Sequence, residues 1–108
     1  MHIITRSRLL EFWEKHPDSE TSLRLWYKLT DTANWKKFVE VREVFSAADQ
    51  VENFTIFNIG GNKYRLIVFI DYTSEKVFIR HILTHAEYDK NDWKQDIGMS
   101  SLLSGRRC

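Results

Sequence analysis

Residues 51–84, VENFTIFNIGGNKYRLIVFIDYTSEKVFIRHILT, decide the fold of this chain. β-branched and aromatic residues dominate three runs, which the turn-forming stretches GGN and TSEK separate. The pattern predicts three consecutive antiparallel strands. The middle run is apolar without a break from Leu66 to Ile70, so we expect it to be covered on both faces or to lie centrally, with helices packed on one face.

The residues before these strands carry one short strand pattern and then helical patterns. HIIT at 2–5 predicts a strand that ends in Thr5, which we expect to cap a helix. RSRLLEFWEKH at 6–16 spaces its apolar residues as one face of that helix. Pro17 ends it, and DSETSLRLWYKLTDT at 18–32 predicts a second helix. Two helices joined at a proline turn form a hairpin.

The remaining segments predict short elements at the ends of the sheet. NWKKFVEVREVFSAADQ, at 34–50, predicts a short, irregular helix that ends in a loop. Thr84 and Glu87 have the spacing of a capping box, so a short final helix is expected to start there. We expect one domain over residues 1–98 and a mobile tail over 99–108. The expected class is α+β, with an N-terminal strand and a helical hairpin packed on a small antiparallel sheet.

Composition narrows the classes of function. Hydrophobic residues make up 43% of the chain and charged residues 29%, as in an ordinary globular domain. The net charge of +1 argues against a strongly basic nucleic-acid binder, so RNA binding would need a local basic face. The only cysteine is Cys108, so neither an intrachain disulfide nor a cysteine metal site is expected. With no membrane-spanning apolar run and no signal-peptide pattern, the cytoplasm is the expected location and no membrane partner is expected.

FIRHILTHAEYDK, residues 78–90, gathers polar side chains that a strand end does not need for folding. Lys63 and Arg65 are two apart on a strand, so they are expected to share a face. If Arg80 lies on the same open face, the three cations form a small basic groove. The alternative left open is ion pairing with acidic neighbours, namely Asp71, Glu75 or Glu87.

His81 and His85 suggest a metal pair only at first sight. Four residues of a strand span ~13 Å, which is too far for two imidazoles to share one ion, and no third ligand stands out. No metal or cofactor is therefore expected. A lone histidine at a strand end is more often structural, but His85 has neighbours suited to a phosphate site: the first amides of the final helix, Tyr88, Asp89 and Lys90.

Tyr88 has two readings. It could stack on a base or donate a proton, or it could dock the final helix together with Trp93. We assign Tyr88 to the site and Trp93 to packing. Lys36 and Lys37 are a secondary prediction as RNA-backbone contacts, because a lysine pair is usually only a solvated face.

Two stretches, FNIGGNKYRLI and RHILTHAEYDK, resemble the HigB-type toxins of bacterial toxin–antitoxin modules. The start, HIITRSRLLEFWEKHPDSETSLRLWY, is similar to the start of the same family, and the resemblance extends from residue 1 to about 96. It implies a RelE-like fold, an mRNA interferase that typically cuts messages on translating ribosomes, and a cognate HigA-type antitoxin. Many ribosome-dependent relatives are strongly basic, so the low charge leaves the need for a ribosome open.

The resemblance also implies roles for three residues. Arg65 in KYRLI matches the superfamily arginine that contacts the scissile phosphate, while His85 and Tyr88 match, by analogy, a basic or histidine residue and a tyrosine near the end of the last strand. Metal-independent cleavage uses the 2′-hydroxyl as nucleophile. Arg65, supported by Lys63 or Arg80, would then stabilise the phosphate charge, His85 would transfer a proton, and Tyr88 would stack on a base or act as an acid.

Two rival functions remain at this point. The fold could serve a non-catalytic RNA-binding or regulatory module in which the same cations hold an RNA backbone and nothing is cut. Alternatively, THAEYDK could be only a helix cap and a docking segment, in which case its variants would lose stability and not activity.

Overall fold

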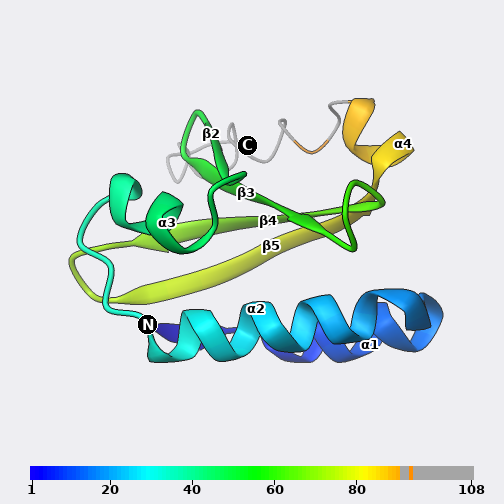
Figure 1. Cartoon of the computed structure of the whole chain (residues 1–108), viewed down its shortest axis with the longest axis horizontal. Coiled ribbons are helices and arrows are strands. Elements are labelled where there is room, and N and C mark those ends of the chain that lie inside the picture. Colours follow the sequence, from blue (N-terminus) through cyan, green and yellow to red (C-terminus); the bar gives the residue numbers. More distant parts are fainter. Residues whose placement is uncertain (91–92, 94–108) are drawn as a thin grey trace, which may run out of the picture.

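The computed structural model of the chain describes residues 1–90 and residue 93. Helices and strands follow one another in the order shown in Figure 1. Their bounds are β1 His2–Ile4, α1 Ser7–Lys15, the 3₁₀ turn η1 Pro17–Ser19, α2 Glu20–Thr32, α3 Phe38–Val44, β2 Asp49–Val51, β3 Phe54–Ile59, β4 Tyr64–Asp71, β5 Lys76–Thr84 and α4 His85–Asp89. The predicted tail at 99–108 lies outside the described residues.

The strands form one five-stranded sheet in the order β1-β5-β4-β3-β2. The predicted antiparallel run of β3, β4 and β5 is confirmed, and β4 is the central strand. Gly60 and Gly61 turn the chain between β3 and β4 with φ angles of 63° and 72°, in the region that glycine adopts without strain. The sheet differs from the expected antiparallel one because β1 pairs in parallel with β5. It also gains β2, because the run that we had expected to be one strand from Val51 is divided into β2 and β3, and β2 extends back to Asp49 in the expected loop.

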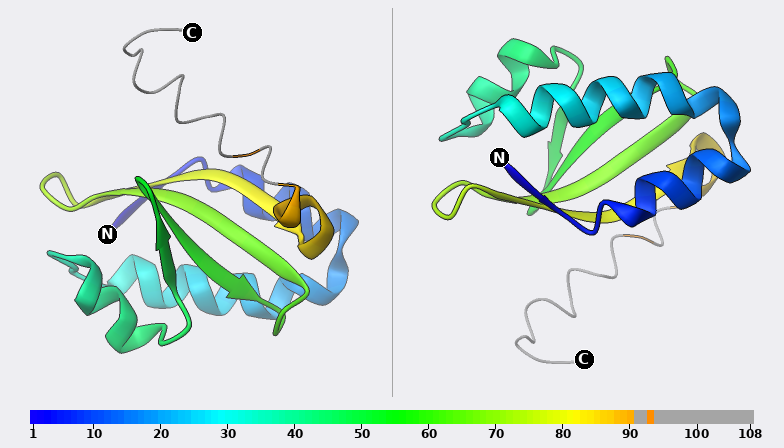
Figure 2. Two further views of the ribbon diagram at one scale, coloured as in Figure 1. Left: turned by 90° about the horizontal axis from the view of Figure 1, so that it is seen from above. Right: turned by 90° about the horizontal axis from the view of Figure 1, so that it is seen from below.

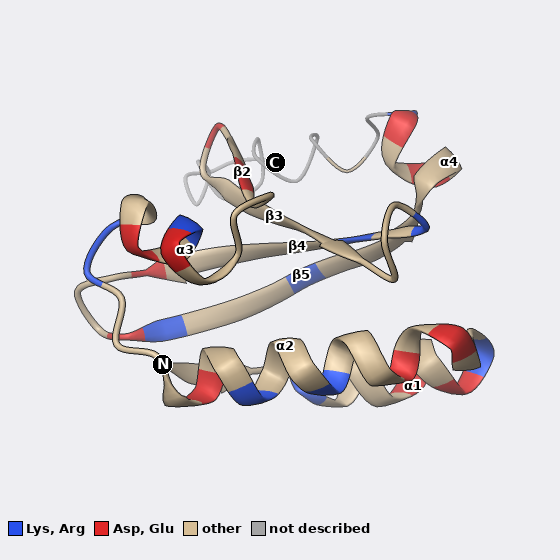
Figure 3. Ribbon diagram, viewed as in Figure 1, with Lys and Arg blue, Asp and Glu red and all other residues tan. Residues whose placement is uncertain are grey.

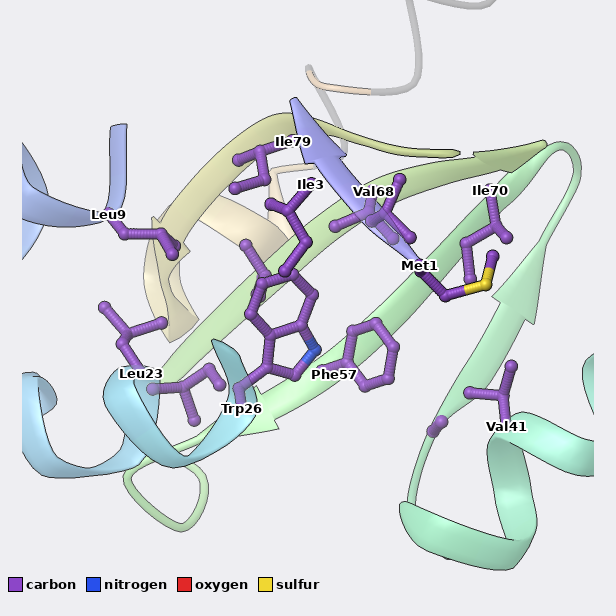
Figure 4. Packing of buried hydrophobic residues seen from close by; sticks show 14 of the residues in the cluster. Met1, Ile3, Leu9, Leu23, Trp26, Val41, Phe57, Val68, Ile70 and Ile79 are labelled. Atoms are coloured by element: carbon purple, nitrogen blue, oxygen red, sulfur yellow. The ribbon is translucent and has the colours of Figure 1, made fainter. Parts of the chain in front are cut away.

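The helical hairpin of α1 and α2 covers one face of this sheet, as predicted (Figure 2). Figure 4 shows the core between the two layers, in which Trp26 of α2 faces Phe57 of β3. The two rings meet edge to face with centroids 5.6 Å apart, and each side chain is only 1% exposed. The α+β class is therefore confirmed, and the hairpin leaves the opposite face of the sheet for other contacts.

A smaller apolar cluster lies on that opposite face, and we call it the open-face cluster. Its buried members are Phe54, Ile56, Ile67 and Trp93. The alternation of β4 explains it, because Leu66 and Val68 point into the hairpin core while Ile67 between them points away. The partly buried Val51, Leu83 and Tyr88 pack against it. The face that carries Arg65 is thus partly apolar.

The start of α1 does not follow the prediction. Thr5 was expected to cap the helix, but the cap residue is Arg6 and no side chain makes the capping hydrogen bond. Thr5 instead adopts a φ of 70°, which turns the chain from β1 into the helix. Its carbonyl oxygen accepts a hydrogen bond from the Arg8 amide at 3.1 Å. A tight turn between strand and helix has therefore replaced side-chain capping.

A β-bulge shifts the register of β5 where Arg80 lies. Ile67 pairs with His81 while the next residue, Val68, pairs with Ile79, so Arg80 is the extra residue. Because of the bulge, the His81 side chain lies on the same face of the sheet as Ile67, away from the hairpin. Simple alternation from Ile79 would have placed His81 on the hairpin side. Within the described residues, no helix is both long and apolar enough to cross a membrane.

Candidate active site

The short helix α4 is fixed where β5 ends. The Thr84 hydroxyl accepts a hydrogen bond from the Glu87 amide at 3.2 Å, and the Glu87 carboxylate accepts one from the Thr84 amide at 3.0 Å. The predicted capping box is therefore confirmed. The His85 amide donates to the Lys63 carbonyl oxygen at 3.0 Å. The His85 and Glu87 amides are thus used within the protein, so these two groups do not serve the phosphate site expected at the first amides of this helix.

Arg65 lies on β4, and its side chain contacts Tyr88 of α4. Its guanidinium carbon lies 5.5 Å from the centroid of the Tyr88 ring. Nη1 donates to the carbonyl oxygens of Asn62 and Tyr64, both at 3.2 Å. An arginine has five N–H donors, so this arrangement orients the group and leaves further donors for an anion. Arg65 and Tyr88, both expected in the site, are thus brought into contact.

Trp93 also contacts Tyr88 and holds it in place. The two rings are stacked, with centroids 5.3 Å apart and planes 14° from parallel. The indole N–H of Trp93 also donates to the Tyr88 carbonyl oxygen at 3.1 Å. Trp93 is 4% exposed and meets Phe54 edge to face at 5.9 Å, so its assignment to packing is confirmed. Tyr88 therefore both docks α4 and faces the arginine.

The surroundings of Tyr88 keep its phenol protonated. Burial raises the pKa of Tyr88 first of all, and the carboxylate of Asp49 raises it further. Arg65 lowers this pKa and Asp89 raises it, with a net result above the ordinary 10.0. At neutral pH the hydroxyl therefore carries its proton and can donate a hydrogen bond, as an unperturbed tyrosine also does. Asp49 was missed in the sequence because it belongs to β2, and only the register opposite Ile56 places it on this face.

His85 lies three residues before Tyr88 on the same helix. Its Nδ1 is 3.0 Å from a carboxylate oxygen of Asp89, and the two side chains are 52% and 60% exposed. The spacing i,i+4 on a helix could have revealed this pair, although Asp89 had no assigned partner. The pair leaves the imidazole orientated and accessible to solvent.

Lys63 does not share a face with Arg65, and that expectation is wrong. β4 begins at Tyr64, so Lys63 belongs to the turn and stands outside the alternation of the strand. Its Nζ forms an ion pair with Asp18 at 3.0 Å, and the Tyr64 hydroxyl donates to the same carboxylate at 2.7 Å. These two hydrogen bonds, that of Tyr64 first, lower the pKa of Asp18 below 3.8. Lys63 thus ties the sheet to the helical hairpin.

The other cations do not gather into one basic face. Figure 3 shows Lys and Arg spread over strands, helices and turns, with acidic residues between them. Lys36 forms an ion pair with Glu75 at 3.0 Å, whereas the alternative left open had paired Glu75 with Lys63, Arg65 or Arg80. Lys36 and Lys37 directly precede α3, which lies at the opposite end of the sheet from α4 (Figure 1). Lys90 ends α4 and is exposed, whereas Arg80 is half-buried at the bulge.

The described part of the chain shows no metal cluster at the site. Among residues 1–90 and 93, no group of three or more His, Cys, Asp and Glu side chains could hold a metal ion. A groove of about 630 Å³ lies between the end of α2 and α3, and none of the candidate side chains except Lys37 lines it. The candidate site therefore lies apart from this groove, at the junction of β4, β5 and α4.

Comparison with known proteins gives matches over most of the chain. Residues 19–91 match the family HigB_toxin, described as the RelE-like toxic component of a toxin-antitoxin system. The mRNA interferase toxin HigB of Escherichia coli K12 is 33% identical over 92 residues, which cover 82% of this chain and 88% of that protein. The mRNA interferase HigB of Escherichia coli O6:H1 is 30% identical over 93 residues, covering 83% and 90% of the two chains.

Proposed function

The chain belongs to the HigB toxins, the RelE-like toxic components of toxin–antitoxin systems, and we propose that it cleaves RNA at the surface formed by Arg65, Tyr88 and His85. Its relatives are named mRNA interferases, and the chain acts as such an endoribonuclease. The observation that carries the site is the contact between the Arg65 guanidinium and the protonated Tyr88 ring at 5.5 Å. It joins a charge stabiliser for a phosphate to a proton donor.

In the proposed reaction, the 2′-hydroxyl of the RNA attacks the adjacent phosphorus and the bond from phosphorus to the 5′-oxygen breaks. A base must take the 2′ proton, an acid must protonate the leaving 5′-oxygen, and a cation must stabilise the charged phosphorane-like state. The products are a 2′,3′-cyclic phosphate and a 5′-hydroxyl. This transesterification requires no oxidant, reductant or cofactor.

Arg65 is the proposed phosphate ligand. The two backbone carbonyls at 3.2 Å hold Nη1, so the guanidinium is orientated before the substrate arrives. Such preorganised cations cost no reorganisation during the reaction. Contact with the Tyr88 ring restricts the guanidinium further.

Tyr88 is the proposed acid. Its ring contacts Arg65 and is stacked on Trp93, so these contacts already use the surface that a base would need for stacking. Burial and the Asp49 carboxylate raise its pKa, whereas Arg65 beside the ring lowers it and so assists loss of the proton. The occupied ring faces favour proton donation over the stacking role that the sequence left open.

His85 is the proposed base. Nδ1 lies 3.0 Å from a carboxylate oxygen of Asp89, a position that favours the tautomer with the proton on that nitrogen. The lone pair of Nε2 can then take the 2′ proton. The imidazole is half exposed, so a substrate can reach it.

The partners follow from the family. A toxin of this kind has an antitoxin, and we take it to be of the HigA type. The substrate is mRNA, and the proposal extends to messages bound to ribosomes in the cytoplasm. Lys90 and Arg80 would contact the RNA backbone beside the site, with Lys63, Lys36 and Lys37 as more remote contacts.

Induced expression in a bacterium tests the function. Growth should stop, cellular mRNA should be cut, and co-expression of the antitoxin should restore growth. Arg65→Ala should remove the toxicity. Arg6→Ala is the matched control, because Arg6 also lies over a tyrosine ring, that of Tyr27, at 5.4 Å on the helical hairpin. Growth arrest without any mRNA cleavage would favour the non-catalytic RNA-binding module instead.

A further inference from the structure

We infer that Trp93 is a positioning residue for the cleavage reaction, acting by holding Tyr88 against Arg65. The inference rests on the proposed function, in which Tyr88 supplies the proton to the leaving oxygen. It assigns to Trp93 a role beyond packing. Trp93 lies two residues beyond the segment 19–91 that matches the family.

Trp93 makes two different contacts with Tyr88. The ring stack, with centroids 5.3 Å apart, sets the orientation of the phenol plane, and the indole N–H bond to the Tyr88 carbonyl at 3.1 Å fixes the backbone of the same residue. Side chain and main chain of Tyr88 are therefore both restrained by a single partner.

Trp93 is itself anchored in the sheet. It is 4% exposed and packs in the open-face cluster, where its ring meets Phe54 of β3 edge to face at 5.9 Å. Phe54 is also 4% exposed. The indole thus connects the rigid sheet, which carries Arg65 on the neighbouring strand, to the helix that carries Tyr88.

α4 needs such an anchor. It has five residues, none of them buried, and an isolated helix of that length is not stable in water. The capping box and the hydrogen bond that the His85 amide donates to Lys63 fix the first turn of α4, but Tyr88 lies near the end of this helix. Without the indole, Tyr88 would lose its ring stack, the hydrogen bond to its carbonyl oxygen and part of its burial. A displacement of about 1 Å at a reacting group can cost a hundredfold in rate.

The test is single-turnover cleavage of an RNA by Trp93→Leu in two backgrounds, the unmodified chain and Tyr88→Ala. In the unmodified chain, Trp93→Leu should lower the maximal rate by about tenfold or more and change the RNA concentration for half-maximal rate by less than about threefold. In the Tyr88→Ala background it should cost nothing further, because the group that it positions is gone. Trp35→Leu is the matched control: Trp35 is also 4% exposed but lies in the hairpin core.

Trp93→Phe provides a milder variant that keeps a buried ring and loses the N–H bond. It should lower the maximal rate by about two- to tenfold with Tyr88 present and leave it unchanged in the Tyr88→Ala background. Equal losses in both backgrounds, or a full rate per folded molecule for both Trp93 variants, would overturn the inference. So would an equal loss in Trp35→Leu. Full activity of Tyr88→Ala itself would instead overturn the proposed role of Tyr88, so the two failures can be told apart.

Discussion

Replacing Arg65 with alanine is expected to abolish most cleavage while the fold survives. Removing one preorganised charge stabiliser lowers a rate by roughly 10² to 10³, which is about 2.7–4 kcal/mol of transition-state stabilisation. For stability, the variant loses two hydrogen bonds to carbonyl oxygens at 3.2 Å and the contact with the Tyr88 ring. Arg65 is half-buried, so these contacts together contribute about 1–2 kcal/mol. For a domain of this size, Tm should fall by roughly 4–15 °C.

The assay is single-turnover cleavage at a temperature where circular dichroism shows both proteins folded. Arg65→Lys separates charge from shape, because lysine keeps the charge but cannot form the planar, bidentate contact of a guanidinium with a phosphate. This variant should recover only part of the rate. Arg6→Ala should retain full activity. A fully active Arg65→Ala protein, or one that loses activity only because it has unfolded, would refute the phosphate role.

The other predictions concern neighbouring groups. Tyr88→Phe should be nearly as inactive as Tyr88→Ala if the hydroxyl is the acid, and a fully active Phe variant would mean that only the ring matters. The rate of the unmodified protein should fall only above pH 10.0, because the pKa of Tyr88 is raised. His85→Ala should lose about a hundredfold or more in rate, and Asp89→Asn should lose less; full activity of His85→Ala would exclude His85 as the base. Asp18→Asn should lower Tm above pH 3.8, where the lowered pKa of Asp18 stabilises the fold, and this difference should vanish as the pH falls through that lowered pKa; a difference that persists in acid would exclude the ionised contact with Tyr64 as its cause.

The sequence predicted the elements that depend on local chemistry. Alternation and turn residues predicted β3, β4 and β5, and the spacing of Thr84 and Glu87 predicted the start of α4. These features arise from neighbours in the chain, so their pattern is visible in the letters. The cap at Thr5 failed because the turn into α1 uses a left-handed backbone conformation instead of a side-chain bond.

The candidate site depended more on contacts between distant segments. Arg65 and Tyr88 were chosen separately, and the sequence held no signal that they touch. Asp49 reaches the same face through the pairing of β2 with β3, and Lys63 leaves it for Asp18, which is 45 residues away in the chain. Such choices follow from how the layers pack, and a single sequence does not record them.

Analysis of the product ends tests the central claim most directly. A defined mRNA would be incubated in a reconstituted translation reaction with the unmodified protein, with Arg65→Ala, or with Arg6→Ala. The account predicts fragments with a 2′,3′-cyclic phosphate and a 5′-hydroxyl from the unmodified protein and from Arg6→Ala, and almost none from Arg65→Ala. Fragments that carry a 3′-hydroxyl and a 5′-phosphate, or equal cleavage by all three proteins, would contradict it.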